Sequence, residues 1–236
     1  MRRGPRLNKG AQPEIAPTRY FLRMRRMRRL ALSSLVIAAF IACGGPPKTA
    51  PEPAAHSLAN LAAQHIAILP TYAVRVVPGL TWGSIGRPSD LQKTLDADII
   101  AAFDERGIRK AWIFPGDMVQ SHKRNPTYAP DPYALAEEFL RSPSLALEQR
   151  LPEPLASEVR TLVAMHDDVR YVFAPVELRL EKAGQGGRGV LRMVLVDARL
   201  SNVAWIGEFA SDTLPAYSPA VTAGIASKFA SAVSTQ

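Results

Sequence analysis

Apolar and polar residues are grouped along the first half of the chain in blocks that predict two strands around a helix. Residues 65–70 (HIAILP) and 111–115 (AWIFP) are short apolar runs ended by proline, which is typical of buried strands. Between them, large apolar residues recur every four positions, at Leu91, Leu95, Ile99 and Phe103. A Ser89/Gln92 capping-box pattern and Gly107 mark the ends of the predicted helix. Strand, helix and strand at this spacing predict a parallel βαβ unit.

The last third of the chain has the period of antiparallel strands. Residues 170–181, 189–199 and 203–209 are alternating runs rich in β-branched and aromatic residues, with short polar connections, which predicts a three-strand meander. A terminal helix is predicted from Ser218-Pro219 onward, with one apolar face formed by Val221, Ile225, Phe229 and Val233. We expect Trp205 to pack under this helix.

The middle of the chain is predicted to be helical over residues 131–140 and again around 155–163. The remaining stretches 71–87 and 116–130 read as long loops. Together these elements predict a single α/β domain over residues 61–236, an α+β sandwich with a mixed sheet: a parallel βαβ start, an antiparallel meander near the C-terminus, and helices packed on the sheet.

Charge is concentrated at the N-terminus. Residues 1–29 hold ten Lys/Arg and one acid, and the segment 30–42 has no charge, whereas from Cys43 onward 19 Lys/Arg face 20 Asp/Glu. The whole-chain net charge of +8 therefore does not indicate a nucleic-acid partner. Two interpretations of the long basic leader stay open: translation starts at Met24 or Met27, or residues 1–10 form a basic disordered arm.

The uncharged run 30–42 (LALSSLVIAAFIA) has thirteen residues, too few for a spanning helix and within the range of about 7–15 for a signal-peptide core. It ends at the only cysteine of the chain. The sequence Phe40-Ile41-Ala42-Cys43 resembles the lipobox of bacterial lipoproteins, although Phe40 stands where Leu is usual. The resemblance implies cleavage after Ala42, a diacylglycerol on the Cys43 sulfur and a further acyl chain on the freed amine. Residues 43–60 would then form a lipidated, proline-rich tether, and Gly44 favours the outer membrane, facing the periplasm.

A second resemblance concerns the domain. An early strand ending in ILP, a helix, a second strand, then VLVDAR and the tryptophan strand VAWIGE are similar to the α/β domain of three groups of proteins. These are the curli-secretion lipoproteins, the TolB amino-terminal domain and the lipoprotein activators of penicillin-binding proteins. The resemblance covers roughly residues 65–233. The long insert at 131–166 departs from it.

Catalytic and cofactor motifs give weaker signals. The stretch 184–189 (GQGGRG) matches GxGxxG but precedes a predicted strand, so a hairpin loop is favoured over a dinucleotide site. The four histidines form no HxxxH or HxH pair, and we expect no metal site and no cofactor. A periplasmic hydrolase using Asp117 with His122 or His166 stays open as the alternative function.

The favoured function is non-catalytic binding or assembly in the cell envelope. Loops that leave the carboxyl ends of parallel strands gather at one edge of a sheet and form its binding crevice. The two predicted loops carry aromatic and charged residues suited to an envelope protein or an anionic glycan: Tyr72, Arg75, Trp82, Asp117, His122, Lys123, Arg124 and Tyr128. The expected partners are therefore the membrane, through lipid on Cys43, an envelope component and, as a third possibility, further copies of the chain in a ring.

Overall fold

The computed structural model describes residues 58–61, 63–166 and 169–234. The basic leader, the apolar run 30–42, Cys43 and the tether up to residue 57 lie outside them, so the expectations for these segments stay predictions. In the described part of the chain, no helix combines the length and the hydropathy needed to span a bilayer.

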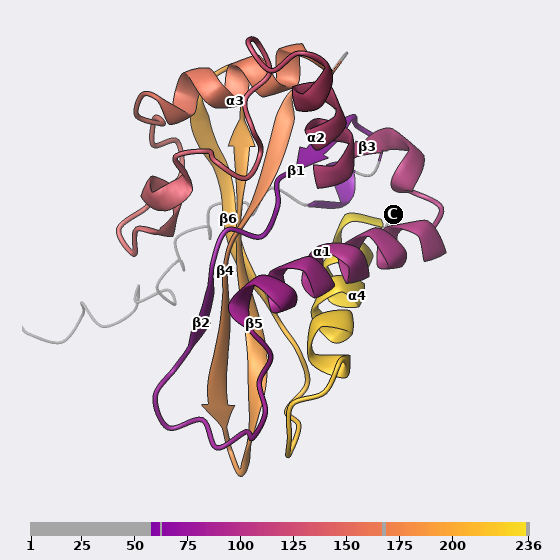
Figure 1. The fold of residues 1–236 in the computed structure, drawn as a ribbon, viewed down its shortest axis with the longest axis vertical. Coiled ribbons are helices and arrows are strands. Elements are labelled where there is room, and N and C mark those ends of the chain that lie inside the picture. The colour runs from indigo at the N-terminus through magenta and orange to yellow at the C-terminus, as the bar shows by residue number, and fades with distance from the viewer. Residues whose placement is uncertain (1–57, 62, 167–168, 235–236) are drawn as a thin grey trace, which may run out of the picture. The chain divides into compact units, whose positions relative to one another are not determined.

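One mixed sheet organises the domain (Figure 1). Its strand order is β3-β1-β4-β5-β6, and β2 also pairs with β4. β1 is parallel to both β3 and β4, whereas β4, β5 and β6 form an antiparallel meander. The strands are β1 (Ile66–Ile68), β2 (Val74–Val76), β3 (Trp112–Ile113), β4 (Tyr171–Ala183), β5 (Gly186–Asp197) and β6 (Asn202–Ala210). The predicted α/β class, with its parallel start and antiparallel meander, is confirmed.

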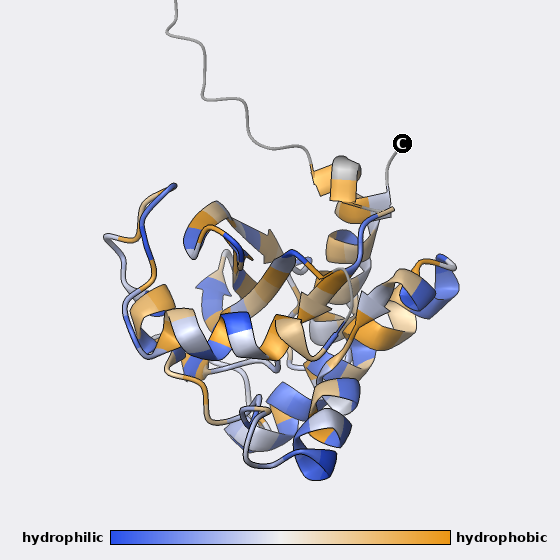
Figure 2. Ribbon diagram, turned by 90° about the horizontal axis from the view of Figure 1, so that it is seen from above, coloured by the Kyte–Doolittle hydropathy of each residue, from blue (hydrophilic) through white to orange (hydrophobic). Residues whose placement is uncertain are grey.

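Helices lie on both faces of the sheet. The α-helices are α1 (Pro88–Glu105), α2 (Pro115–Arg124), α3 (Leu155–Ala164) and α4 (Ala220–Ser234). Three short 3-10 helices are η1 (Leu58–Leu61), η2 (Arg109–Ala111) and η3 (Glu137–Arg141). The helix ribbons alternate between hydrophilic and apolar residues (Figure 2), as expected where one side of each helix is buried.

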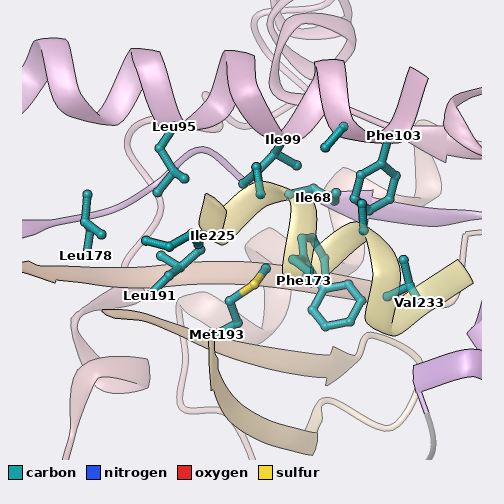
Figure 3. Packing of buried hydrophobic residues seen from close by; sticks show 14 of the residues in the cluster. Ile68, Leu95, Ile99, Phe103, Phe173, Leu178, Leu191, Met193, Ile225 and Val233 are labelled. Atoms are coloured by element: carbon teal, nitrogen blue, oxygen red, sulfur yellow. The ribbon is translucent and has the colours of Figure 1, made fainter. Parts of the chain in front are cut away.

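The first core lies between the sheet and the helices α1 and α4 (Figure 3). Leu95, Ile99 and Phe103 of α1 and Ile225 of α4 are fully buried against β4 and β5. At the centre is Phe173 of β4, whose ring contacts those of Trp112, Trp205 and Phe229 at centroid distances of 5.8, 6.2 and 5.1 Å. Trp205 thus packs on the side of the sheet that α4 covers, as predicted.

The second core lies on the opposite face and covers only part of it. Val172, Ala174 and Val176 of β4 and Val194 and Val196 of β5 are buried there. The residues that cover them come from α2, from the segment 131–151 and from α3: Met118, Leu135, Leu140, Leu145, Leu151, Leu155, Val159 and Leu162. The insert 131–166 therefore acts as a lid over one half of the face.

β4 changes partner halfway along its length. Its first residues, Tyr171–Phe173, pair with β1, and Leu178–Leu180 pair with β2. The β4–β5 register shifts at a β-bulge between Pro175 and Glu177, while the Pro175 carbonyl oxygen accepts from the Tyr72 amide on the other edge at 2.9 Å. Beyond this bulge, β2, β4 and β5 extend below the insert in Figure 1, and no residue of β4 after Val176 belongs to the second core, so the insert leaves this half of the face open.

Several predicted elements differ from the structure. Residues 131–136 form turns and η3 begins only at Glu137, so the predicted helix over 131–140 is wrong. The predicted loop 116–130 contains most of α2, and the predicted loop 71–87 contains β2. The predicted Ser89/Gln92 capping box is wrong, because α1 begins at Pro88 with Arg87 as its N-cap and has no side-chain cap. Gln92 Nε2 donates to the carbonyl oxygens of Thr71 and Tyr72, at 2.9 and 2.7 Å. The glycine-rich stretch is a hairpin turn as predicted, with Gly184 at φ +55°.

Candidate functional site

The most extensive cluster of charged side chains lies on the open half of the sheet. Directly paired residues of neighbouring strands share a face, and the pairings Arg75–Arg179, Glu177–Arg192, Glu181–Arg188 and Arg192–Glu208 place seven charged residues together. We call this surface the arginine–carboxylate face: Arg75 of β2, Glu177, Arg179 and Glu181 of β4, Arg188 and Arg192 of β5, and Glu208 of β6.

Glu177 is the centre of this face. Its side chain is 10% exposed and contacts Arg75 at 3.1 Å and Arg141 of η3 at 2.9 Å. Burial alone would raise the pKa of this carboxyl, but the bond from Arg141 and the charges of Arg75, Arg141 and Arg179 together lower it. Glu177 is therefore held ionised, and three arginines are fixed around it.

Two further ion pairs continue the pattern toward the β4–β5 hairpin and β6. Arg188 contacts Glu181 at 2.8 Å, and Arg179 contacts Glu208 at 2.8 Å. The side chain of Glu208 is 46% exposed and that of Arg188 is 44% exposed. Such pairs contribute little to stability, because water competes for both partners, but they present a regular mixed-charge pattern to solvent.

Tyr72 and Arg75, from the first predicted loop, are brought together at this face. The Tyr72 hydroxyl donates to Glu138 at 3.3 Å, and the Arg141 guanidinium lies 5.9 Å from the centre of the Tyr72 ring. Burial and the charge of Glu138 raise the pKa of Tyr72. Arg141 thus connects Tyr72 to Glu177 and, through it, to Arg75.

Trp82 lies elsewhere and is buried, with 6% of its surface exposed. Its Nε1 donates to the Leu214 carbonyl oxygen at 3.1 Å, and its ring contacts Tyr217 edge-on at 5.9 Å. A Cβ on Gly187 would come within 2.8 Å of the Trp82 ring, so the ring lies directly on the β4–β5 hairpin. Trp82 closes this end of the sheet, and its indole does not face solvent.

The remaining predicted residues belong to α2 and the turn after it. Asp117 accepts a bond from the Phe114 amide at 3.0 Å and so caps the start of α2. His122 Nδ1 donates to the Ala129 carbonyl oxygen at 2.8 Å, which fixes the turn that follows. Lys123 and Arg124 are exposed in the last turn of α2, and Tyr128 is 74% exposed. No described contact joins this group to Tyr72 or Arg75, so the two predicted loops do not form one site.

A water-sized depression borders α2 and α3. Met118, Leu162 and Met165 line it, together with Ser121 and His166, whose Oγ and Nε2 atoms lie 3.5 Å apart. This distance is at the limit of a hydrogen bond. Across the described residues, no group of three or more His, Cys, Asp or Glu side chains could hold a metal ion.

Two carboxyls near the insert, which no sequence pattern indicates, have raised pKa values. Asp96 of α1 accepts bonds from the Thr71 amide and hydroxyl at 3.0 and 2.6 Å, yet burial outweighs them and raises its pKa. Glu137 of η3 is 2% exposed, and its Oε2 has no partner among the described residues. Burial, and then the charges of Asp96 and Glu158, raise the pKa of Glu137 well above its ordinary value. No spacing or composition signal distinguishes Glu137 from the exposed Glu138 beside it.

Comparisons with known proteins give one structural likeness. No family model matches the chain, and no curated protein matches it. Among solved structures, the LpoB C-terminal domain from Salmonella enterica matches with a TM-score of 0.31 and 11% identity, over 64% of this chain and 84% of the matched one. LpoB is a penicillin-binding-protein activator lipoprotein, and so falls in one of the groups that the strand pattern resembles. A TM-score this low carries no information on the function of this chain.

Replacing Trp82 by alanine tests the structural role of the indole. We expect Trp82→Ala to lower the free energy of unfolding by about 3–5 kcal/mol, because it empties a packed site and removes one of the two hydrogen bonds that the Leu214 carbonyl oxygen accepts. The exposed Tyr128→Ala should change it by no more than about 0.5 kcal/mol. Urea denaturation measures both, and a Trp82→Ala variant as stable as the parent would contradict the assignment.

Glu137 makes stability depend on pH. In the unfolded chain its carboxyl ionises near its ordinary pKa of about 4.3, whereas the folded protein holds the proton to higher pH. The free energy of unfolding therefore falls as the pH rises above the unfolded pKa of Glu137, and this loss levels off above the folded pKa. The total loss is about 1.4 kcal/mol for each unit between the two pKa values.

Glu137→Gln removes that term, so the free energy of unfolding of the variant relative to the parent should rise between pH 4 and pH 8. Urea denaturation across this range measures it, with the exposed Glu105→Gln of α1 as control. A pH-independent difference between Glu137→Gln and the parent would refute the assignment.

Proposed function

We propose that this chain is a lipid-anchored protein of the cell envelope whose α/β domain binds another envelope component through the arginine–carboxylate face. The observation that carries the proposal is the position of the only cysteine. Cys43 directly follows an uncharged apolar run and directly precedes a proline-rich stretch, with a basic leader before both. This is the order that export, lipidation and tethering require.

The anchor follows from the chemistry of that cysteine. A diacylglycerol on the Cys43 sulfur and a further acyl chain on the amine freed by cleavage after Ala42 give two or three acyl chains. Each buried methylene contributes about 0.8 kcal/mol, which holds the protein on the bilayer. Gly44 in the next position favours the outer membrane, with the domain in the periplasm. The residues 44–55 (GGPPKTAPEPAA) then form an extended tether of roughly 35 Å, at about 3 Å per residue.

The binding role rests on the part of the sheet that the insert leaves open. Strand residues hold their side chains in fixed directions, so this surface is more rigid than a loop site. Its alternating charges suit a partner that carries both signs, such as a protein surface, and its arginines also suit carboxylates or phosphates of an anionic glycan. Tyr72 and the half-exposed Arg75 lie where the face meets the insert.

The anchor is tested by the mass of the N-terminal peptide of protein extracted from the membranes of its native host. We expect a peptide that begins at Cys43 and carries two or three acyl chains. A Cys43→Ser variant should lack the modification and leave the membrane fraction after cleavage, or keep residues 1–42 uncleaved. An unmodified peptide beginning at Met1, Met24 or Met27 in the parent protein would refute the anchor.

The binding face is tested by replacing single exposed arginines. Arg75→Ala should weaken cross-linking to the envelope partner by about tenfold, the loss of one charge-assisted contact, without lowering the melting temperature. Glu177 stays paired with Arg141 in this variant, so no buried charge is left alone. The matched control is Arg109→Ala, which removes another half-exposed arginine and its ion pair with Asp104, outside the face. Equal cross-linking of both variants would rule out the face as the binding surface.

A further inference from the structure

The outer edge of β6 is unpaired along most of its length. At its start, residues 148–151 cover it, through bonds between Glu148 N and Val203 O at 2.8 Å and between Val203 N and Gln149 O at 3.0 Å. At its end, Lys228 Nζ donates to the Ala210 carbonyl oxygen at 2.8 Å. Between these points, from Ala204 to Phe209, no segment of the described chain pairs with the outer edge of the strand.

The backbone groups that point outward can be identified from the two residues that follow this segment, Ala210 and Ser211. The Ser211 amide donates inward to Gly189 of β5, whereas the Ala210 carbonyl oxygen points outward to Lys228. Because the direction alternates along a strand, the N–H and C=O groups of Ile206 and Glu208 also point outward. The free edge therefore offers two donors and two acceptors to another strand.

The aromatic side chains of this segment match those of a second copy. A two-fold axis through Gly207 places Trp205 opposite Phe209 of the second copy, and Ile206 opposite Glu208 of the second copy. Two aromatic pairs then flank a glycine pair, an arrangement that stabilises neighbouring strands. Trp205 already lies over Gly207, since a Cβ there would come within 2.2 Å of its ring, and it is only partly buried in one copy.

Other registers are less favourable. An axis at Glu208 places two like charges directly opposite each other. An axis at or before Ile206 brings the second strand against Val203, which residues 148–151 already cover. An axis at Phe209 brings Glu208 opposite Ala210, whose carbonyl oxygen Lys228 already occupies. Only the axis at Gly207 uses all four free backbone groups.

We propose that two copies of this chain pair antiparallel through β6, with the two-fold axis at Gly207, and form one continuous sheet. Ile206 N–H donates to Glu208 O of the second copy, Glu208 N–H donates to Ile206 O of the second copy, and symmetry repeats both bonds. An axis perpendicular to the sheet keeps the same faces on the same side. The two arginine–carboxylate faces therefore join into one surface, with the two Glu208–Arg179 ion pairs on either side of the seam.

This inference does not depend on the lipid anchor or on the envelope partner. Its test is the molecular mass of the full chain in detergent, by analytical ultracentrifugation over a range of protein concentrations. We expect the parent to form a dimer. Glu208→Pro removes an N–H that β5 does not use and should raise the dissociation constant at least tenfold. The matched control Glu208→Ala loses the same ion pair with Arg179 but keeps the N–H, and should dimerise like the parent.

A covalent test keeps the register falsifiable even if the proline variant unfolds. In a Cys43→Ser background, chains with Ile206→Cys and chains with Glu208→Cys are oxidised separately and as a mixture. The pairing places positions 206 and 208 of the two copies directly opposite each other, about 5.5 Å apart between Cα atoms, within the range of a disulfide. Disulfide-linked dimers should form in the mixture and not in either variant alone.

Three results would overturn the proposal. A parent chain that stays monomeric at high concentration excludes self-pairing and would assign the edge to a different occupant. Equal dissociation constants for Glu208→Ala and a folded Glu208→Pro would show that dimers form elsewhere. Cross-linking of a single variant as efficient as that of the mixture would exclude this register. Failure of the envelope-partner test, which measures cross-linking at Arg75, leaves all three readouts unchanged.

Discussion

β4 is the element on which the rest of the domain depends, because it is paired along both of its edges. β5 covers one edge, while β1 and β2 share the other. The β4–β5 register shifts between Pro175 and Glu177, and on the other edge the partner of β4 changes from β1 to β2, so the strand divides into two halves. The first half is buried on both faces and holds Phe173 at the centre of the aromatic core. The second half is buried on one face only, and the charged surface arises there.

Carboxyl groups beside the two halves of β4 have pKa shifts in opposite directions. Glu177, just beyond the bulge, sits among three arginines that together lower its pKa. Glu137 lies in the insert that covers the first half, where burial without a partner raises its pKa. An ionised carboxylate is stabilised at the open face, because arginines and water contact it, whereas within the described part of the chain neither contacts the buried Oε2 of Glu137. The bulge in β4 thus separates the solvated charges of the arginine–carboxylate face from the apolar second core, next to which Glu137 is buried.

Two of the exposed surfaces of the domain are formed by strands. Trp82, which a loop interpretation would place against a partner, closes the end of the β4–β5 hairpin instead. Asp117 and His122 are engaged in capping α2 and in fixing the turn after it. Within the sheet, the arginine–carboxylate face and the edge of β6 are exposed, and they meet at Glu208. If β6 pairs with a second copy, the two domains present one wide charged surface.

The sequence by itself determined which segments are strands and helices wherever burial is periodic. The four-residue repeat of α1, the alternating runs of the meander and the apolar face of α4 depend on local pattern, and the structure has all three. The helix predicted over residues 131–140 is wrong, because turns precede η3 and the polar Glu137 is buried there. This burial depends on how the insert packs and not on the local sequence. The sequence groups the binding candidates by their position in two predicted loops. Of these candidates, only Tyr72 and Arg75 lie at the arginine–carboxylate face.

Arg179, Arg188, Arg192 and Glu208 joined Arg75 because strand register brings residues more than a hundred positions apart onto one face. Strand register depends on pairing between distant residues, and the open face and the free edge of β6 also depend on which segments cover the sheet. A local hydrophobic pattern contains neither kind of information.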